Sequence, residues 1–390
     1  MGVSSMGIRK CALSSSAFRK LKEYYDNREA ASEKWRMQGR KVVGELGADV
    51  PDEYIIAAGM LPVRIYAAPK ECLPEAERFL EYAFDPMMRA KFEKIADGTY
   101  AREIDALAVS NSTDVIIRLY LYLRELHRVE PERPLPEMAF IDWLFTRNRL
   151  HQERNEFIMQ KFMKTIEKWS GSPLSEKAVE TAAKLCNRDR EALRRMGRLR
   201  HGGEVHISGS EALVIIGSAF FMEREEHLKL VEEVVKEAEE WPSLDGIRVF
   251  YTGSVQEDTE LYDMVENCGC VIVGEDHDWG DRFYDRDFMT EYGAVRGAAD
   301  CYMMREFSSK KAFVSQRVEA INRQADRTGA QAVFFYNNIY EEAASWDYPE
   351  QKKSLEARGI KTACFAKMQW PCGKNEELEE RIREAAEKWK

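Results

Sequence analysis

The stretch that decides the fold is residues 104–126, IDALAVSNSTDVIIRLYLYLREL. Its first part, IDALAVSN, is a short apolar run of the kind that forms a buried strand in a parallel sheet. The second part, STDVIIRLYLYLREL, predicts a helix with Ser112 as its N-cap. An apolar strand followed at once by a helix is the repeating unit of parallel α/β folds, so this stretch predicts that class.

The same alternation continues on the N-terminal side. DEYIIAAGM (residues 52–60) predicts a short helix that closes at Gly59, and LPVRIYA (61–67) predicts a strand. Residues 74–100 have a helical pattern, and residues 16–45 predict one or two charged amphipathic helices. This half of the chain is therefore expected to form one α/β domain preceded by helices.

On the C-terminal side, Pro131, Pro134 and Pro136 predict a loop, and residues 148–200 are almost purely helical in pattern. Alternation then resumes. Two further helices are predicted, EALVIIGSAFF (211–221) near a domain border and EELEERIREAAEKW (376–389) at the end. Four strands are predicted: IRVFYTGS (247–254), CVIVGED (270–276), AVFFYNN (332–338) and KTACFA (361–366).

These patterns predict an α/β protein with two Rossmann-like (flavodoxin-like) parallel-sheet domains and a helical domain. The expected boundaries are N-terminal helices over 1–47 that pack with the helical domain, an α/β domain over 48–147, the helical domain over 148–205, and a second α/β domain over 206–390. Two facing α/β domains create a cleft, which is where ligands usually bind.

Composition limits the classes of partner. The chain has 390 residues, a net charge of −10 and a pI of about 5.4, an acidic balance that argues against nucleic acid or an anionic membrane. No apolar stretch approaches the ~18 residues of a membrane span, and the N-terminus lacks a signal-peptide pattern. We therefore expect a cytoplasmic protein.

The eight cysteines are scattered, and only Cys268 and Cys270 lie close together. Two thiolates alone do not complete a metal site, so both are expected to be small buried core residues. The chain has no Walker A motif, no G-x-G-x-x-G after a strand and no G-x-S-x-G elbow. These absences argue against a nucleotidase, a dinucleotide-dependent dehydrogenase and an α/β-hydrolase.

Several local patterns, each weak alone, follow one another in a collinear order that resembles the 2-hydroxyacyl-CoA dehydratase and benzoyl-CoA reductase subunit family, which includes the 2-hydroxyglutaryl-CoA dehydratase D-component. They are PDEYIIAAGMLPVR (51–64), DPMMRA (85–90), VSNSTD (109–114) with RLY (118–120), Gly171 to Ser175 with Asn187 to Arg190, ISGSE (207–211), GED (274–276) with GDR (280–282), and YE (340–341) with DYP (347–349).

The departures from this family pattern fall on its cysteines. Where the family places cluster-binding cysteines, this chain carries Asp85, Thr113 and Tyr340. A thiolate holds an Fe–S cluster, whereas a carboxylate, a hydroxyl and a phenol do not hold one with comparable stability. The resemblance thus implies a subunit that binds no cluster itself, with the [4Fe–4S] cluster in a partner. We expect the three side chains to converge between the two α/β domains.

The resemblance also implies partners and chemistry. Subunits of this family work as heterodimers on an acyl-CoA thioester. A separate ATP-dependent iron–sulfur activator injects one electron, which reaches the thioester carbonyl through the cluster and forms a ketyl radical anion, and a related branch reduces aromatic-ring thioesters. For this chain the implied partners are a cysteine-complete sister subunit, the activator and the acyl-CoA substrate.

Several polar residues are candidates for roles in such a cleft. Glu53 matches the family's Glu beside the substrate and is a candidate acid/base, or it merely favours the dipole of its helix. Asn111, Arg118 and Arg282 are candidates for substrate binding, although the arginines suit surface ion pairs equally well. Residues 275–278, Glu-Asp-His-Asp, follow a strand and predict either a cation site or, more commonly, an exposed charged loop.

Three functions remain open at this point. The first is a subunit of a heteromeric 2-hydroxyacyl-CoA dehydratase or aryl-CoA reductase-like lyase or reductase complex. The second is a non-catalytic scaffold or binding protein of the same fold. The third is a cluster-free enzyme that acts on a small anion or a CoA thioester by acid–base chemistry. A dimer, with a sister chain or with itself, is expected for the first two.

Overall fold

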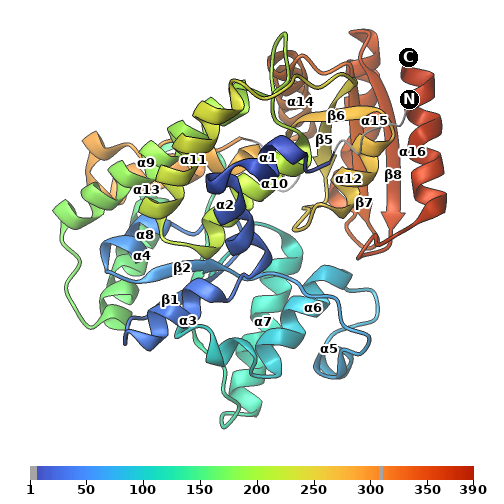
Figure 1. Ribbon diagram of the computed structural model, residues 1–390. Coiled ribbons are helices and arrows are strands. Elements are labelled where there is room, and N and C mark those ends of the chain that lie inside the picture. The colour runs from blue at the N-terminus through green and yellow to red at the C-terminus, as the bar shows by residue number, and fades with distance from the viewer. Residues whose placement is uncertain (1–6, 307–310) are drawn as a thin grey trace.

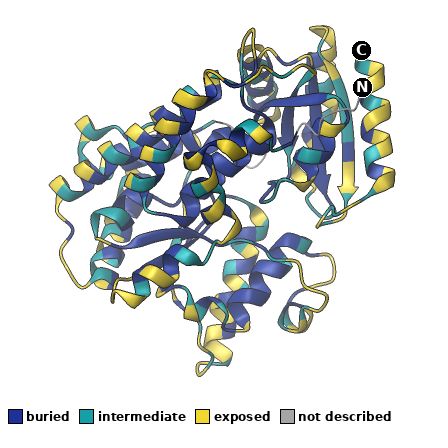
Figure 2. Ribbon diagram, in the orientation of Figure 1, coloured by how far each residue is buried: buried dark blue, intermediate teal, exposed yellow. Residues whose placement is uncertain are grey.

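Two separate four-stranded parallel sheets form the framework of the protein. The computed structural model describes residues 7–306 and 311–390. Figure 1 shows the sheets in two lobes with a layer of long helices beside them. The predicted class, α/β with two Rossmann-like parallel sheets and added helices, is confirmed. Figure 2 shows that both sheets are largely buried, as parallel sheets covered by helices should be.

The first sheet has the strand order β2-β1-β3-β4, and all of its strands are parallel. Its strands are β1 (Val42–Leu46), β2 (Leu61–Arg64), β3 (Ala106–Ser110) and β4 (Glu137–Ile141). The helices of this lobe are α4 (Asp52–Ala57), α5 (Pro74–Phe79), α6 (Pro86–Ala96), the 3₁₀ turn η1 (Tyr100–Arg102) and α7 (Asp114–Val129).

This lobe differs from the sequence prediction at several points. Residues 42–46 form the central strand β1, not the end of a helix over 16–45, and β4 was not predicted. The helix predicted over 74–100 is broken between α5 and α6, because residue 85 precedes a proline and is therefore disfavoured in a helix. The N-cap of α7 is Thr113 rather than Ser112.

The second sheet has the order β6-β5-β7-β8 and is again fully parallel. All four strands were predicted, and their bounds are β5 (Ile247–Gly253), β6 (Cys270–Glu275), β7 (Ala332–Asn338) and β8 (Lys361–Met368). The helices of this lobe are α12 (Glu260–Asn267), η3 (Asp281–Tyr284), α14 (Val314–Thr328), α15 (Ala343–Ala357) and α16 (Glu376–Trp389).

The helical layer draws on several parts of the chain. Its longest members are α8 (Arg149–Ser170) and α9 (Glu176–Arg198), and α11 packs against α9 while α13 packs against α8. The other helices of the layer are α1 (Lys10–Ser14), α2 (Ser16–Asp26), α3 (Ala30–Met37), α10 (Gly209–Ser218), α11 (Arg224–Ala238) and α13 (Gly293–Met303), with the 3₁₀ turns η2 (Ala219–Phe221) and η4 (Thr290–Tyr292) between them. Within the described residues, no helix combines the length and the apolar character that a bilayer crossing requires.

Candidate functional site

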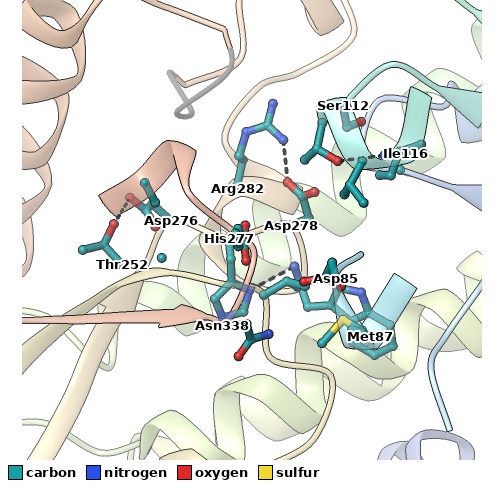
Figure 3. A pocket seen from close by; sticks show the side chains of 18 of the residues that line it. Asp85, Met87, Ser112, Ile116, Thr252, Asp276, His277, Asp278, Arg282 and Asn338 are labelled. Atoms are coloured by element: carbon teal, nitrogen blue, oxygen red, sulfur yellow. Dashed lines mark hydrogen bonds and ion pairs between the residues drawn. The ribbon is translucent and has the colours of Figure 1, made fainter. Parts of the chain in front are cut away.

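A cavity of about 140 Å³ lies between the two sheets, at the ends where their strands terminate. Figure 3 shows residues of both lobes around it, with Asp85, Ser112 and Ile116 from the first and Thr252, Asp276 and Asn338 from the second. In each sheet the chain order reverses at the centre, between β1 and β3 and between β5 and β7. Ligands bind at such switch points in open α/β sheets, and here both switch points face one cavity.

Two of the three positions with a missing family cysteine lie in the cavity wall. Asp85 is the N-cap of α6 and accepts a hydrogen bond from the Met88 backbone N–H at 2.8 Å. Thr113 is the N-cap of α7 and accepts from the Ile116 backbone N–H at 3.3 Å. Both side chains therefore satisfy backbone donors that a helix start leaves unpaired.

Tyr340 lies differently from these two residues. It is partly exposed, has a φ of 68°, and packs edge-on against the exposed Tyr82 with ring centroids 6.3 Å apart. Among the described residues, the cavity wall includes Glu341 but not Tyr340. Tyr340 thus belongs to the surface beside the cavity, and its neighbour in sequence takes the inward position.

The other candidate residues divide between the cavity and the fold. Arg282 lines the cavity, is 4 % exposed, and forms ion pairs with Asp278 at 2.7 Å and Asp49 at 3.2 Å. Arg118 is exposed on α7 and pairs with Glu81 at 2.5 Å. Asn111 is buried, and its amide nitrogen donates to the Trp143 carbonyl at 2.9 Å. Of these three residues, only Arg282 is placed to contact a ligand in the cavity.

Glu53 lies within the fold, away from the cavity wall. It is fully buried on α4, where its carboxylate pairs with Arg190 of α9 at 2.6 Å and accepts from the Tyr302 hydroxyl of α13 at 3.0 Å. Arg190 also donates to Asn187 at 2.9 Å, so the Asn-x-x-Arg pattern seen in the sequence holds Glu53 in place. This geometry links the first sheet to the helical layer.

The strand exit at 275–278 is not the exposed loop that sequence reasoning favoured. Asp276, His277 and Asp278 line the cavity, whereas Glu275 is buried in an ion pair with Arg200 at 2.6 Å. His277 is 4 % exposed, and its Nε2 lies 2.8 Å from the Tyr262 hydroxyl. Burial lowers the pKa of His277 to about 4, so this imidazole is neutral at pH 7.

Every cation of the cavity wall is matched by a carboxylate. Arg64 lies 3.7 Å from Glu45, and Lys91 lies 2.5 Å from Glu257. Arg282 is paired as described above, and Arg317 pairs with Asp347. Within the described ranges, the wall therefore has no unpaired cation that could bind an anionic group.

Three carboxyls of the wall, here called the cavity carboxyls, form no ion pair with any described residue: Asp85, Asp276 and Glu341. Each accepts a hydrogen bond from a neutral donor, which is a backbone N–H for Asp85, the Thr252 hydroxyl at 2.7 Å for Asp276 and the Ser254 hydroxyl for Glu341. Desolvation raises the pKa of Asp85 to about 6. It raises the pKa of Asp276 and that of Glu341 to about 7, and the charge of Asp85 adds to the effect on Glu341.

Sequence reasoning missed Glu341, Asn338, Lys91 and Thr252 as wall residues. Asn338 is the last residue of β7 and Thr252 is next to the last residue of β5, and a position at a strand end is the signal that could have found them. Glu341 directly follows Tyr340, so the correct segment was identified with the wrong side chain. Lys91 lies within a predicted helix, and nothing in the local pattern distinguishes it.

The donor set of the cavity does not fit an Fe–S cluster. Its wall, as far as the chain is described, contains no cysteine, and Asp85 and Thr113 hold oxygen atoms that already cap helices. In the same parts of the chain, no group of three or more His, Cys, Asp or Glu side chains is arranged to hold a metal ion.

Comparisons with known proteins agree with the family that the sequence resembles. The 2-hydroxyglutaryl-CoA dehydratase D-component family matches residues 48–388. The (R)-phenyllactyl-CoA dehydratase beta subunit of Clostridium sporogenes is 23 % identical over 327 residues, 83 % of this chain and 85 % of that protein. The lactoyl-CoA dehydratase subunit beta of Anaerotignum propionicum is 23 % identical over 350 residues, 88 % and 90 % of the two chains.

A third relative is the (R)-2-hydroxyglutaryl-CoA dehydratase subunit beta of Acidaminococcus fermentans, 21 % identical over 338 residues, 84 % of this chain and 87 % of that protein. The family match covers most of the chain and includes strands of both sheets and the long helices α8 and α9. The chain therefore belongs to the 2-hydroxyglutaryl-CoA dehydratase D-component family.

Proposed function

We propose that this chain is the cluster-free subunit of a heteromeric complex that acts on an acyl-CoA thioester, as a 2-hydroxyacyl-CoA dehydratase or an aryl-CoA reductase-like enzyme. A cysteine-complete sister subunit holds the [4Fe–4S] cluster, and an ATP-dependent iron–sulfur activator supplies the electron. The one-electron chemistry at the thioester then belongs to the partner's cluster, and this chain contributes part of the dimer and of the cleft.

The observation that carries the proposal is which side chains occupy positions 85 and 113 and what they bind. Both lie in the wall of the inter-sheet cavity, and both hold an oxygen-bearing side chain that caps a helix. The relatives that match nearly the full length are each named as a dehydratase beta subunit, which supports a subunit role. A family member whose own cavity lacks thiolates needs a partner to supply the cluster.

The structure also guides the assignment of roles to other residues. Glu53 is committed to an ion pair with Arg190, which supports a part in holding α4 against the helical layer rather than acid–base catalysis. Arg118 and Asn111 are likewise occupied by Glu81 and by the segment after β4. Arg282 lies at the cavity, and its two carboxylate partners leave it suited to shaping the wall.

The proposal is tested on the native complex, purified without oxygen through an affinity tag on this chain. We expect a 1:1 complex with a sister subunit and about four iron atoms per heterodimer, with a broad absorption near 400 nm. This chain alone, reconstituted with iron and sulfide, should take up less than one cluster's worth of iron. A stoichiometric [4Fe–4S] signal from the isolated chain by electron paramagnetic resonance would overturn the proposal, as would a homodimer that turns over substrate without a partner.

A further inference from the structure

Two tyrosines from different lobes meet beside the cavity, at the surface of the molecule. Tyr82 lies in the turn between α5 and α6 and is 87 % exposed, and its ring packs edge-on against the ring of Tyr340, which follows β7. Asp85 and Glu341, which are close to these tyrosines in sequence, both line the cavity. The ring pair therefore connects the two lobes at the outer edge of the cavity wall.

The backbone of Tyr340 is strained. Its φ of 68° lies in the left-handed region, which costs free energy for every residue that carries a Cβ. Within the described chain, Lys367 with a φ of 59° is the other residue of this kind. Such strain persists only where the surroundings hold it, and it is common in segments that change conformation. The contact with the ring of Tyr82 supplies a restraint of this type.

Deeper contacts between the lobes are buried and charged. Glu257 of the second lobe lies 2.5 Å from Lys91 of the first, and it accepts a hydrogen bond from the Ala67 backbone N–H at 2.7 Å. Asp49 of the first lobe lies 3.2 Å from Arg282 of the second. Separating buried charge pairs is costly, whereas two exposed rings on short turns separate easily. Movement that changes access to the cavity is therefore expected at the ring pair.

The size of the cavity gives such a movement a purpose. Its volume of about 140 Å³ is well below the roughly 300–1,000 Å³ of pockets that enclose drug-sized ligands. A larger ligand fits only if the cavity extends outward between the lobes. The ring pair lies at the edge where this extension would reach solvent.

From the inter-lobe ring pair, its strained member and the small cavity, we propose that Tyr82 and Tyr340 form a gate. The gate is closed while the two rings are in contact, as in this structure. It opens when the two turns move apart, and the cavity then reaches solvent between Asp85 and Glu341. The gate is built from this chain alone and serves any ligand of the cavity, so it does not depend on the proposed subunit role.

Access to the cavity can be measured with a thiol reporter in the full chain. Ala320 of α14 lines the cavity and is 5 % exposed, so Ala320→Cys places a thiol in the wall. Mass spectrometry gives the rate at which N-ethylmaleimide labels each cysteine. Labelling of the reporter follows the gate, labelling of the exposed Cys72 follows the reagent, and labelling of the buried Cys301 follows unfolding.

Removing either ring should open the gate. Tyr82→Ala and Tyr340→Gly should each raise the labelling rate of the reporter, relative to Cys72, about tenfold, the factor that corresponds to the loss of one aromatic pair. Labelling of Cys301 should stay unchanged. Tyr82→Phe keeps the ring and should leave the reporter rate as it is. Because Tyr82 is exposed, its variants should fold, and the test does not rest on Tyr340→Gly alone.

Lys367→Gly is the matched control for Tyr340→Gly. It relieves the same kind of backbone strain in the same lobe and leaves both rings in place, so the reporter rate should not change. An unchanged reporter rate in Tyr82→Ala or Tyr340→Gly would overturn the gate. An equal rise in Lys367→Gly or Tyr82→Phe, or a parallel rise at Cys301, would overturn it as well.

Discussion

Two groups of buried ionisable side chains in this molecule differ in whether they form ion pairs. The first, here called the helical-layer network, joins the first lobe to α9 and α11 and pairs all of its charges: Asp52, Glu53, Asp189, Arg190 and Arg224. The second is the set of cavity carboxyls, which meet only neutral donors. A buried charge that is fully paired serves the fold, whereas a titratable group at a cleft that forms no ion pair is available to a ligand.

The largest effect should come from breaking the helical-layer network. Arg190→Met leaves the fully buried Glu53 without its cation and should lower the free energy of unfolding by about 3–5 kcal/mol. Urea denaturation measures the loss. The double variant Glu53→Leu with Arg190→Met removes both charges and should recover a part of it. A loss below about 1 kcal/mol in the single variant would show that Glu53 is not held as described.

The cavity carboxyls should make the fold less stable as the pH rises. Their pKa values are about 6 and 7 in the native state, against about 4 in an unfolded chain, so between pH 4 and 7 the native state binds more protons than the unfolded state. The free energy of unfolding therefore falls as these groups ionise, by roughly 2–3 kcal/mol for each carboxyl between pH 4.5 and 7.5. Urea denaturation at both pH values should show a smaller fall in Glu341→Gln than in the unmodified chain. An identical fall in both would refute the raised pKa of Glu341.

A smaller effect should come from the cap of α7. Thr113→Ala removes the acceptor of the Ile116 N–H and should cost about 1 kcal/mol, measured by thermal unfolding. Thr113→Ser keeps the hydroxyl and is the control, expected to lose a few tenths of that amount at most. If both variants lose the same stability, packing of the threonine methyl rather than capping explains the residue.

The smallest effect should be at Arg118. Its ion pair with Glu81 is exposed to solvent, so Arg118→Ala should change the free energy of unfolding by less than about 0.5 kcal/mol. The same variant should leave the kinetics of the native complex unchanged, since the residue does not line the cavity. A rise in KM for the acyl-CoA substrate would instead return Arg118 to the candidates for phosphate binding.

The second sheet was predictable because each of its strands is an apolar run followed by a helix, whereas two strands of the first sheet were not. In β1, VVGEL places Glu45 in a buried strand, and Arg64 of the neighbouring strand lies beside it, a contact that no local pattern reveals. In β4, EMAFI is a partly exposed edge strand that directly follows a proline-rich loop. Pairing with neighbouring strands, rather than local sequence preference, makes both segments β-strands.

For the site, the sequence identified segments better than side chains. The segment around positions 340–341 was placed near the cleft, but only the structure shows that Glu341, not Tyr340, lines the cavity. The role of Glu53 depends on Arg190, which is 137 positions away in sequence. A contact between residues so far apart cannot be inferred from a single sequence, so the ion pair between Glu53 and Arg190 could not be predicted.

The two helix caps at positions 85 and 113 have a consequence for substitution by cysteine. Asp85 and Thr113 each satisfy a backbone donor at the start of α6 or α7, a task that cysteine performs poorly. A change to cysteine at both positions would cost about 1 kcal/mol at each helix. Each single change to cysteine would lose one cap without assembling a set of thiolates, so the caps favour the present residues over stepwise replacement by cysteine.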